Sequence, residues 1–471
     1  MMINRRDFLF KMSMATTGVA LGFSGFQHRA QALTTHDTVA AMRSYGFGEL
    51  VPTLTQNTGE TFLALPKGFK YKVLGKAGSK MSDGHITPSS HDGMACFQIG
   101  NELRLIRNHE VSNGKIPKPG AAIGENPYDE TTGGGTTTLV INPETLEVIK
   151  DFVSLSGTLN NCAGGRTPWK SWISCEETTL GQAIRTNQVI NPTGGYPKAH
   201  GYCFEVFASA NASVEPVPLK AMGRFKHEAI AVDQNTGIIY LTEDAKTAGF
   251  YRFLPQRNQY LAEGGTLQML KIKDKDAFDT RKGLKTGQCF ATNWVTIDHP
   301  DPVAADLDES AVYKQGLGKG AATFARLEGA YSDEHGRIYF VSTNGGDNRG
   351  GQIWRYDPNS IEEGTVTLIF ESPSPEILDM PDNICLKPNS DLLFICEDSD
   401  YLGEGGTPEN YMRILSPNGK MANFAKNIAK DFETSEFAGS TFSEDGKTLF
   451  VNLQAVGATF AIWGDWNTFR R

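Results

Sequence analysis

The stretch Asn161–Glu177, NCAGGRTPWKSWISCEE, contains the pattern through which the rest of the chain can be interpreted. It offers a thiol at Cys162, turns at a Gly-Gly pair, and continues as a short strand that ends in the paired carboxylates Glu176 and Glu177. A soft sulfur ligand and hard oxygen ligands on one hairpin suit iron better than zinc or calcium alone. Taken by itself, such a stretch more often means a buried free cysteine beside a surface acidic pair. Its context changes that balance.

The same layout recurs five more times. Each copy opens with a polar residue and a small residue, forms a short strand, turns at Gly, Asn or Asp, and enters a β-branched or aromatic strand that closes on polar or acidic residues. The six copies begin at Asp92, Asn161, His227, Leu327, Pro381 and Glu436. Self-similarity at such a period is typical of a propeller, in which each unit supplies the strands of one blade. The sequence therefore predicts an all-β, six-bladed β-propeller, with residues 33–471 as a single domain.

The opening residues of the six copies predict the lining of a central channel. In a propeller the first strand of each unit is the innermost, so the channel positions are Asp92, Cys162, Glu228, Glu328, Asp382 and Glu436. Five carboxylates on one axis repel one another, and bound cations relieve that repulsion. Further acids follow at the strand ends, namely Glu110, Glu176, Glu177, Glu243, Asp244, Glu397 and Asp398. From both sets we predict a metal site in the channel, with the ligands Cys162, Glu176, Glu228, Glu328, Asp382, Glu397 and Glu436.

Composition excludes several other classes of protein. The formal net charge of -9 shows no basic footprint for nucleic acid. The seven cysteines are odd in number and include no CxxC pair, so the chain is neither a disulfide scaffold nor a structural zinc module. We expect the cysteines other than Cys162 to be free and mostly buried. The longest interval between copies contains Gly249–Pro302, which we interpret as an insertion that overhangs the channel mouth.

The N-terminus predicts export. Arg5 and Arg6 precede a mildly apolar run that reaches about Phe26, and Ala30-Gln31-Ala32 is a small-x-small cleavage site. Twin arginines ahead of such a run indicate a Tat signal over residues 1–32, so the partners include the Tat export machinery. A Sec signal or a chance arginine pair is the alternative. No other run approaches a membrane span. We expect a periplasmic or secreted monomer with no stable membrane insertion.

Several motifs resemble those of the PhoX-type alkaline phosphatases. These are NCAGGRTPWKSWISCEE, GRFKHEA (Gly223–Ala229), FARLEGA (Phe324–Ala330), PDNICLKPNSDLLFICED and EFAGSTFSEDGKTLFVN, and the similarity extends from about residue 60 to the end of the chain. The resemblance implies a Tat-exported six-bladed propeller whose channel holds Fe³⁺ and Ca²⁺. It also implies that Cys162, Glu228 and Glu328 bind metal and that Arg326 holds substrate phosphate. Arg-Leu-Glu-Gly stands here where larger members have Arg-Pro-Glu-Trp, so we expect a different wall around the phosphate.

Phosphate-ester hydrolysis is also reasonable on physical grounds. Phosphoryl transfer needs charge neutralisation and in-line positioning, which clamped cations supply. Arg326 can form a bidentate pair with two phosphate oxygens, and its two-residue spacing from Glu328 places both on one face of a strand. The alternative is that Arg326 only neutralises Glu328. We therefore predict a metallophosphatase acting on small phosphate monoesters. A calcium-dependent propeller lactonase or esterase, which Cys162 disfavours, and a non-enzymatic binding propeller stay as alternatives.

Overall fold

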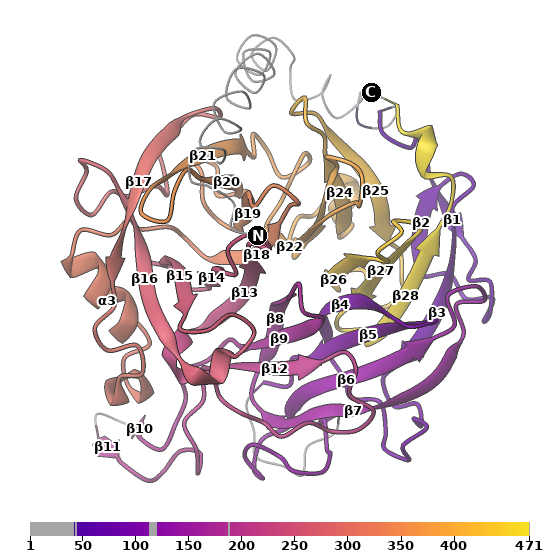
Figure 1. Ribbon diagram of the computed structural model, residues 1–471. Helices are drawn as coiled ribbons and strands as arrows, with labels where there is room; N and C mark the ends of the chain where they lie inside the picture. The colour runs from indigo at the N-terminus through magenta and orange to yellow at the C-terminus, as the bar shows by residue number, and fades with distance from the viewer. Residues whose placement is uncertain (1–41, 43–44, 113–119, 187–188, 471) are drawn as a thin grey trace, which may run out of the picture.

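Six strands form a closed ring around the axis of the molecule (Figure 1). The structure is a computed structural model that describes residues 42, 45–112, 120–186 and 189–470. Each ring strand packs against the next, and the last packs against the first. The ring strands are β4 (His91–Ile99), β8 (Asn161–Arg166), β13 (His227–Val232), β18 (Leu327–Ser332), β22 (Pro381–Leu386) and β26 (Phe437–Phe442). Each of the six sequence copies supplies one of them, so the predicted all-β propeller arrangement is confirmed.

Further antiparallel strands extend each ring strand outward. β4 and β8 are followed by β5 (Glu102–His109), β6 (Gly134–Ile141), β7 (Val148–Thr158), β9 (Ser171–Glu176) and β12 (Cys203–Phe207). β13 and β18 are followed by β14 (Ile239–Glu243), β15 (Phe250–Pro255), β16 (Gly265–Ile272), β17 (Cys289–Thr296), β19 (Ile338–Ser342), β20 (Gln352–Pro358) and β21 (Gly364–Glu371). β22 and β26 are followed by β23 (Leu393–Glu397), β24 (Tyr411–Leu415), β25 (Met421–Asn427), β27 (Thr448–Leu453) and β28 (Ala458–Trp463).

The N-terminal strands complete the last two sheets. β3 (Lys70–Lys76) pairs with β28, while β1 (Leu50–Thr53) and β2 (Leu63–Pro66) continue the sheet of β22 beyond β25. Segments from opposite ends of the chain therefore lie side by side (Figure 1). This pairing joins the two ends of the chain within the last two sheets through backbone hydrogen bonds.

The six ring strands fall into five hydrogen-bonded sheets, because β17 pairs with both β16 and β21. β13 and β18 consequently belong to one nine-stranded sheet. The interval Gly249–Pro302 is thus not the overhanging insertion that its length predicted. Its residues form β15, β16 and β17, which build the outer part of that sheet.

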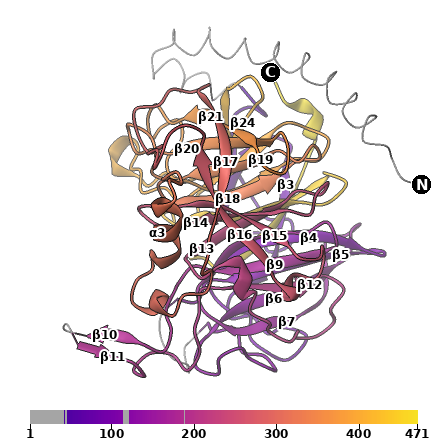
Figure 2. The ribbon, with the colours of Figure 1, turned by 60° about the vertical axis from the view of Figure 1, so that its left-hand side comes forward.

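Short helices and one hairpin lie between the strands. The helices are α3 (Ala311–Gly318) and the 3₁₀ helices η1 (Lys220–Met222), η2 (Leu261–Glu263), η3 (Val303–Asp306), η4 (Glu404–Gly406) and η5 (Trp466–Thr468). β10 (Ile184–Thr186) and β11 (Val189–Asn191) form a hairpin that stands away from the ring (Figure 2). Within the described residues, every helix is too short or too polar to cross a membrane. The predicted Tat signal lies outside the described residues.

The hydrophobic core lies between neighbouring sheets. One cluster joins Phe394 and Phe424, from the sheet of β22, to Phe442 and Trp466, from the segment that contains β26. Their rings meet mostly edge to face, which is the favourable arrangement for aromatic pairs. Such contacts fix each ring strand relative to the next. They therefore also fix the side chains that line the channel.

Each ring strand carries a β-bulge near its start, and this explains the small residue in the repeated pattern. The register between the first and second strand shifts at this point in all six units. A bulge bends the strand and re-aims a side chain. Neighbouring strands then approach closely: a Cβ on Gly93 would lie 2.5 Å from the Cα of Ala163, and one on Gly329 would overlap the carbonyl oxygen of Asp382. Only a small residue fits after the channel residue at these places.

Candidate metal centre

A cavity of about 290 Å³ lies at the end of the channel where the ring strands begin. Nine carboxylates, one thiol and one guanidinium line it. The ionisable lining residues are Asp92, Glu110, Cys162, Glu177, Glu228, Asp244, Arg326, Glu328, Asp382, Asp398 and Glu436. Gln454 lies among them, and its amide nitrogen donates to Asp92 at 3.0 Å and to Glu110 at 2.6 Å. The lining is therefore acidic and suited to binding cations, as the sequence predicts.

Three positions in each unit build the cavity. The leading residue precedes the ring strand, and its carbonyl accepts a hydrogen bond from the backbone of the closing residue, which follows the second strand. The leading residues are Ser90, Asn160, Lys226, Arg326, Met380 and Glu436, and their closing residues are Glu110, Glu177, Asp244, Thr343, Asp398 and Gln454. The channel residue lies two positions after the leading residue, on the same side of the strand. In order, the channel residues are Asp92, Cys162, Glu228, Glu328, Asp382 and Ala438.

Glu436 therefore does not occupy the sixth channel position that the sequence assigned to it. Its carbonyl accepts from the backbone of Gln454, and the adjacent Phe437 pairs with Leu453, so Glu436 is a leading residue and Ala438 is the channel residue. The carboxylate of Glu436 nevertheless reaches the cavity from its rim. The repeat thus contributes carboxylates from four channel positions, together with the Cys162 thiol.

Two groups of three carboxylates have the spacing of cation ligands. Glu228, Glu328 and Asp382 form one triad and Asp92, Glu110 and Glu436 the other, and within each the ligand oxygens lie within 4.8 Å of one another. Burial raises the pKa of all six carboxylates above ordinary values. Repulsion from neighbouring acids is the second cause for all of them except Glu110, where hydrogen bonds partly oppose the effect of burial. Such carboxylates gain most from a cation, because the ion offsets both effects. The donor set therefore fits metal ions.

Side chains of one unit clamp the channel residues of the next. The Asn108 amide donates to the carbonyl oxygens of Cys162 at 3.1 Å and of Ala163 at 2.7 Å. The Thr242 hydroxyl donates to the carbonyl of Glu328, and the Asn452 amide to that of Asp92, both at 2.6 Å. These buried bonds hold the bulged backbone in place, which keeps the ligand side chains aimed at the axis.

Cys162 lines the cavity beside Glu228, although it belongs to neither carboxylate triad. Its buried thiol donates to the carbonyl oxygen of His227 at 3.3 Å. Burial raises the pKa of this thiol well above its ordinary value, and the nearby carboxylates of Glu228 and Glu177 raise it further. A thiolate at this place consequently needs a cation beside it. Of the other cysteines, Cys96, Cys175, Cys203, Cys385 and Cys396 are free and buried and Cys289 is free and exposed, as expected.

The structure does not bring Glu176 and Glu397 to the cavity. Glu176 accepts from His200 Nδ1 at 2.7 Å and from the backbone of Leu159, Gly201 and Tyr202. Glu397 accepts from the Arg413 side chain at 2.8 Å and from the backbone of Asp379 and Tyr411. Neighbouring residues of a strand point to opposite sides, so in each acidic pair the second acid, Glu177 or Asp398, faces the cavity.

Arg326 and Lys226 are the cationic leading residues, and they occupy equivalent places in successive units. Each pairs with the closing acid of the preceding unit: Arg326 Nε lies 2.9 Å from Asp244, and Lys226 Nζ lies 2.8 Å from Glu177. Arg326 Nη2 also donates to Glu328 at 2.7 Å. Both side chains are 29% exposed; Arg326 lines the cavity, and Lys226 pairs with the cavity-lining Glu177. The left-handed backbone of Arg326 is shared by the leading residues Ser90, Asn160 and Met380, so it is not particular to this residue.

Lys226 and Gln454 are the residues that sequence reasoning missed. Lys226 stands directly before the His-Glu pair that was recognised, and Gln454 ends the last copy where four of the other five copies have acids. Aligning the closing residues of all six copies would have selected Glu110, Glu177, Asp244, Asp398 and Gln454. The first acid of each pair is more conspicuous in the sequence, but only the pairing register shows which of the two faces the channel.

Comparison with known proteins accounts for the arrangement. Pseudomonas fluorescens PhoX, solved with the transition-state analogue vanadate, superposes with a TM-score of 0.67 at 18% identity over 91% of this chain and 100% of that one. A gluconolactonase from Xanthomonas campestris gives a TM-score of 0.40 at 10% identity, covering 88% of this chain and 98% of its own. No curated protein matches significantly in sequence. The family model of the alkaline phosphatase PhoX matches residues 45–457, nearly the whole described chain, and the protein therefore belongs to this family of metal-dependent phosphatases.

Proposed function

We propose that the cavity binds Fe³⁺ and Ca²⁺ and that the enzyme hydrolyses small phosphate monoesters outside the cytoplasm, after export by the Tat machinery. The observation that carries the proposal is the convergence of nine carboxylates, one thiol and one arginine in about 290 Å³. The PhoX family consists of extracytoplasmic phosphatases, which agrees with the twin arginines Arg5 and Arg6.

Different residues suit the two kinds of ion. The triad of Asp92, Glu110 and Glu436 offers only oxygen, which calcium prefers. The triad of Glu228, Glu328 and Asp382 lies near the Cys162 thiol in the ring, and this mixed set suits iron. Glu177, Asp244 and Asp398 supply further oxygens around both. When bound, the ions supply Lewis acidity and neutralise charge on the phosphoryl group.

Arg326 would hold the transferring phosphate. Its Nε and Nη2 atoms are committed to Asp244 and Glu328, whereas Nη1 makes no hydrogen bond within the described part of the chain. Cations at these two carboxylates would compete with the guanidinium for their oxygens. The planar fork would then be free to turn its donors to two phosphate oxygens.

Lys226 would be a second cation at the mouth. Its equivalence to Arg326 places it one unit away along the rim, where Glu177 holds its ammonium group. Burial opposes the charge on Lys226, but the carboxylate of Glu177, helped by that of Asp244, outweighs this and raises its pKa. A permanently charged lysine beside Arg326 favours an anionic substrate. It also limits the repulsion that the acidic rim exerts on such a substrate.

The test is metal analysis and assay of protein exported by its own signal. Elemental analysis should find both iron and calcium, and the protein should hydrolyse p-nitrophenyl phosphate. A protein that contains calcium alone and hydrolyses lactones, but not p-nitrophenyl phosphate, would contradict the proposal. Replacement of Arg5 and Arg6 by lysine should block export of a reporter fused after Ala32. Undiminished export in a strain without the Tat machinery would exclude that route.

A further inference from the structure

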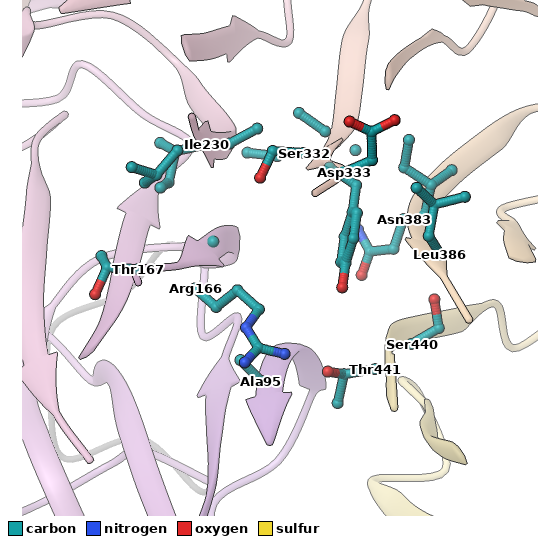
Figure 3. A pocket seen from close by; sticks show the side chains of 18 of the residues that line it. Ala95, Arg166, Thr167, Ile230, Ser332, Asp333, Asn383, Leu386, Ser440 and Thr441 are labelled. Carbon is teal, nitrogen blue, oxygen red and sulfur yellow. The ribbon is translucent and has the colours of Figure 1, made fainter. Parts of the chain in front are cut away.

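A second and larger cavity, of about 810 Å³, occupies the other end of the channel (Figure 3). It begins one residue beyond the channel residues, since Gly93, Ala163, Ala229, Gly329 and Asn383 line it. The two cavities therefore lie end to end within the same ring, and they share no lining residue. The volume of the second cavity is in the range of small-molecule sites.

Arg166, the last residue of β8, points into this cavity (Figure 3). Its guanidinium lies 5.6 Å from the ring centroid of Phe97, and its Nη2 atom lies 3.7 Å from Glu444 Oε1. Burial raises the pKa of the Tyr331 phenol, and the Arg166 charge and a side-chain hydrogen bond with Arg166 oppose that effect. The Arg166 side chain is 32% exposed. Phe97 and Tyr331 thus hold Arg166 in position at the wall of the cavity.

The arginines that stabilise the fold look different. Arg413 is buried and donates to Glu397 and Asn423, and Arg224 is buried and donates to His200, Thr179 and Asp306. Each has several fixed acceptors at hydrogen-bond distance. Among the described residues, Arg166 pairs with one carboxylate, at a distance longer than a hydrogen bond, and has the Tyr331 hydroxyl as a further neighbour. The donors that Tyr331 does not take are therefore available to a ligand.

Acids near Arg166 are already occupied. Glu444 accepts from the backbone of Gln98 at 3.1 Å and lies 3.6 Å from Lys170, so Arg166 shares it with two other donors. Asp333 is held by its own turn and by Arg337. Of the carboxylates that line the cavity, only Glu444 forms an ion pair with Arg166, and the pair is long and shared.

Hydroxyl and amide groups complete the wall. Ser332, Asn383, Ser440 and Thr441 line the same cavity and surround the Arg166 side chain in the view of Figure 3. The Ser440 hydroxyl is buried and makes no hydrogen bond among the described residues. Thr441 accepts one weak bond from the backbone of Cys96 and keeps its proton free to donate. A charged fork with neutral donors around it is the usual composition of an oxyanion site.

We propose that this cavity is a second ligand site, distinct from the metal centre, which binds a small molecule through a carboxylate or phosphate group on Arg166. The guanidinium fork takes two oxygens of the anion. Thr441 donates to the same group or to an adjoining one. The apolar residues Ile230 and Leu386 give the remainder of the ligand a surface to pack on.

Equilibrium dialysis of the metal-loaded enzyme tests the proposal with two probes, inorganic phosphate and succinate. If the site accepts phosphate, the wild type shows two classes of phosphate site, and Arg166→Gln shows one. If the site accepts carboxylates, succinate binds the wild type, and Arg166→Gln weakens it about 10-fold or more, as expected for a lost charged hydrogen bond. In both cases kcat/KM for p-nitrophenyl phosphate and inhibition by phosphate stay unchanged, because Arg166 lies outside the catalytic cavity.

Arg257→Gln is the matched control, since it removes an equally charged side chain that is 54% exposed and lines neither cavity. Thr441→Val is a second variant that keeps the shape of the wall and removes a donor. It should weaken the same probe about 3-fold. The proposal is wrong if neither probe binds the wild type outside the catalytic site. It is equally wrong if Arg257→Gln loses as much binding as Arg166→Gln.

Discussion

The two ends of the central channel are built by the same six strands but differ in charge. At the end where the ring strands begin, nine carboxylates line the cavity together with Arg326, and Lys226 pairs with one of these carboxylates, Glu177. At the other end two arginines and two lysines balance four carboxylates, among hydroxyl and amide groups. One end therefore attracts cations, whereas the balanced wall of the other leaves Arg166 able to take an anion.

The difference shows which features of the channel come from the repeated unit. The acidic end arises because every unit places a residue at the same three positions, each fixed by a bulge and a backbone hydrogen bond. The opposite end depends on residues such as Arg166, Ser332 and Thr441, which occur once and follow no repeat. Symmetric geometry thus produces the metal centre, while individual side chains determine the second cavity.

Metal removal should give the largest effect and act on one end alone. Chelation of the exported enzyme should lower kcat/KM by about 100-fold or more, since the site loses its main means of stabilising charge. It should also lower Tm, because the buried triads then repel one another without compensation. Assays and thermal melts before and after re-addition of iron and calcium measure both. Full activity in protein shown by elemental analysis to be metal-free would contradict the assignment of the acidic end.

Glu176→Gln tests the distinction between structural and cavity-facing acids. His200 lies between Glu176 and Asp129 and is buried; burial lowers its pKa, but the two carboxylates outweigh this and raise it to about 9. The folded-state pKa is above the ordinary 6.5, so this contribution to stability is complete below about pH 6.5 and is lost as the pH rises through about 9. Glu176→Gln should cost about 3 kcal/mol at pH 6 and flatten this pH dependence, measured by urea unfolding.

Glu177→Gln is the control for that variant, because Glu177 is the adjacent acid and faces the cavity. It should reduce bound metal and leave the stability change between pH 6.5 and 9 in place. Loss of metal from Glu176→Gln, with Glu177→Gln unaffected, would reverse the assignment of the two acids.

Arg326→Lys should lower kcat/KM for phosphate monoesters about 10-fold or more, which corresponds to about 1.4 kcal/mol. Lysine keeps the charge but loses the planar fork. Metal content should stay near wild type, and competitive inhibition by phosphate should weaken in parallel. The alternative, in which Arg326 only neutralises Asp244 and Glu328, predicts an unchanged rate and unchanged phosphate inhibition.

The sequence predicted the acidic end of the channel well, because repetition makes it visible. Asp92, Cys162, Glu228, Glu328 and Asp382 all line the cavity from their expected strands. The prediction was wrong in placing Glu436 at the sixth channel position, since the sixth unit opens two residues later than its acidic residue suggests. A one-residue shift in strand register decides which acid of each pair faces the channel, and no pattern in the sequence fixes that register. For this reason the prediction selected Glu176 and Glu397 instead of the adjacent acids that face the cavity. The cavity around Arg166 gave no signal, because the positions that line it repeat but the residue types at those positions do not.

Lys226→Gln should give the smallest effect, and it asks whether equivalence in the repeat extends to function. Lys226 and Arg326 occupy the same position in successive units and pair with Glu177 and Asp244 in the same way. Only Arg326 also reaches a channel residue, Glu328, so Lys226 lies further from the reacting phosphate. Its loss should raise KM for p-nitrophenyl phosphate about 3-fold at low salt with little change in kcat, and the difference should shrink as salt screens the rim.

Lys170→Gln, which removes a lysine at the opposite end of the channel, should leave KM unchanged. If kcat of Lys226→Gln falls as much as that of Arg326→Lys, Lys226 contacts the transferring phosphate. If KM at low salt is unchanged, Lys226 has only the structural role of holding Glu177.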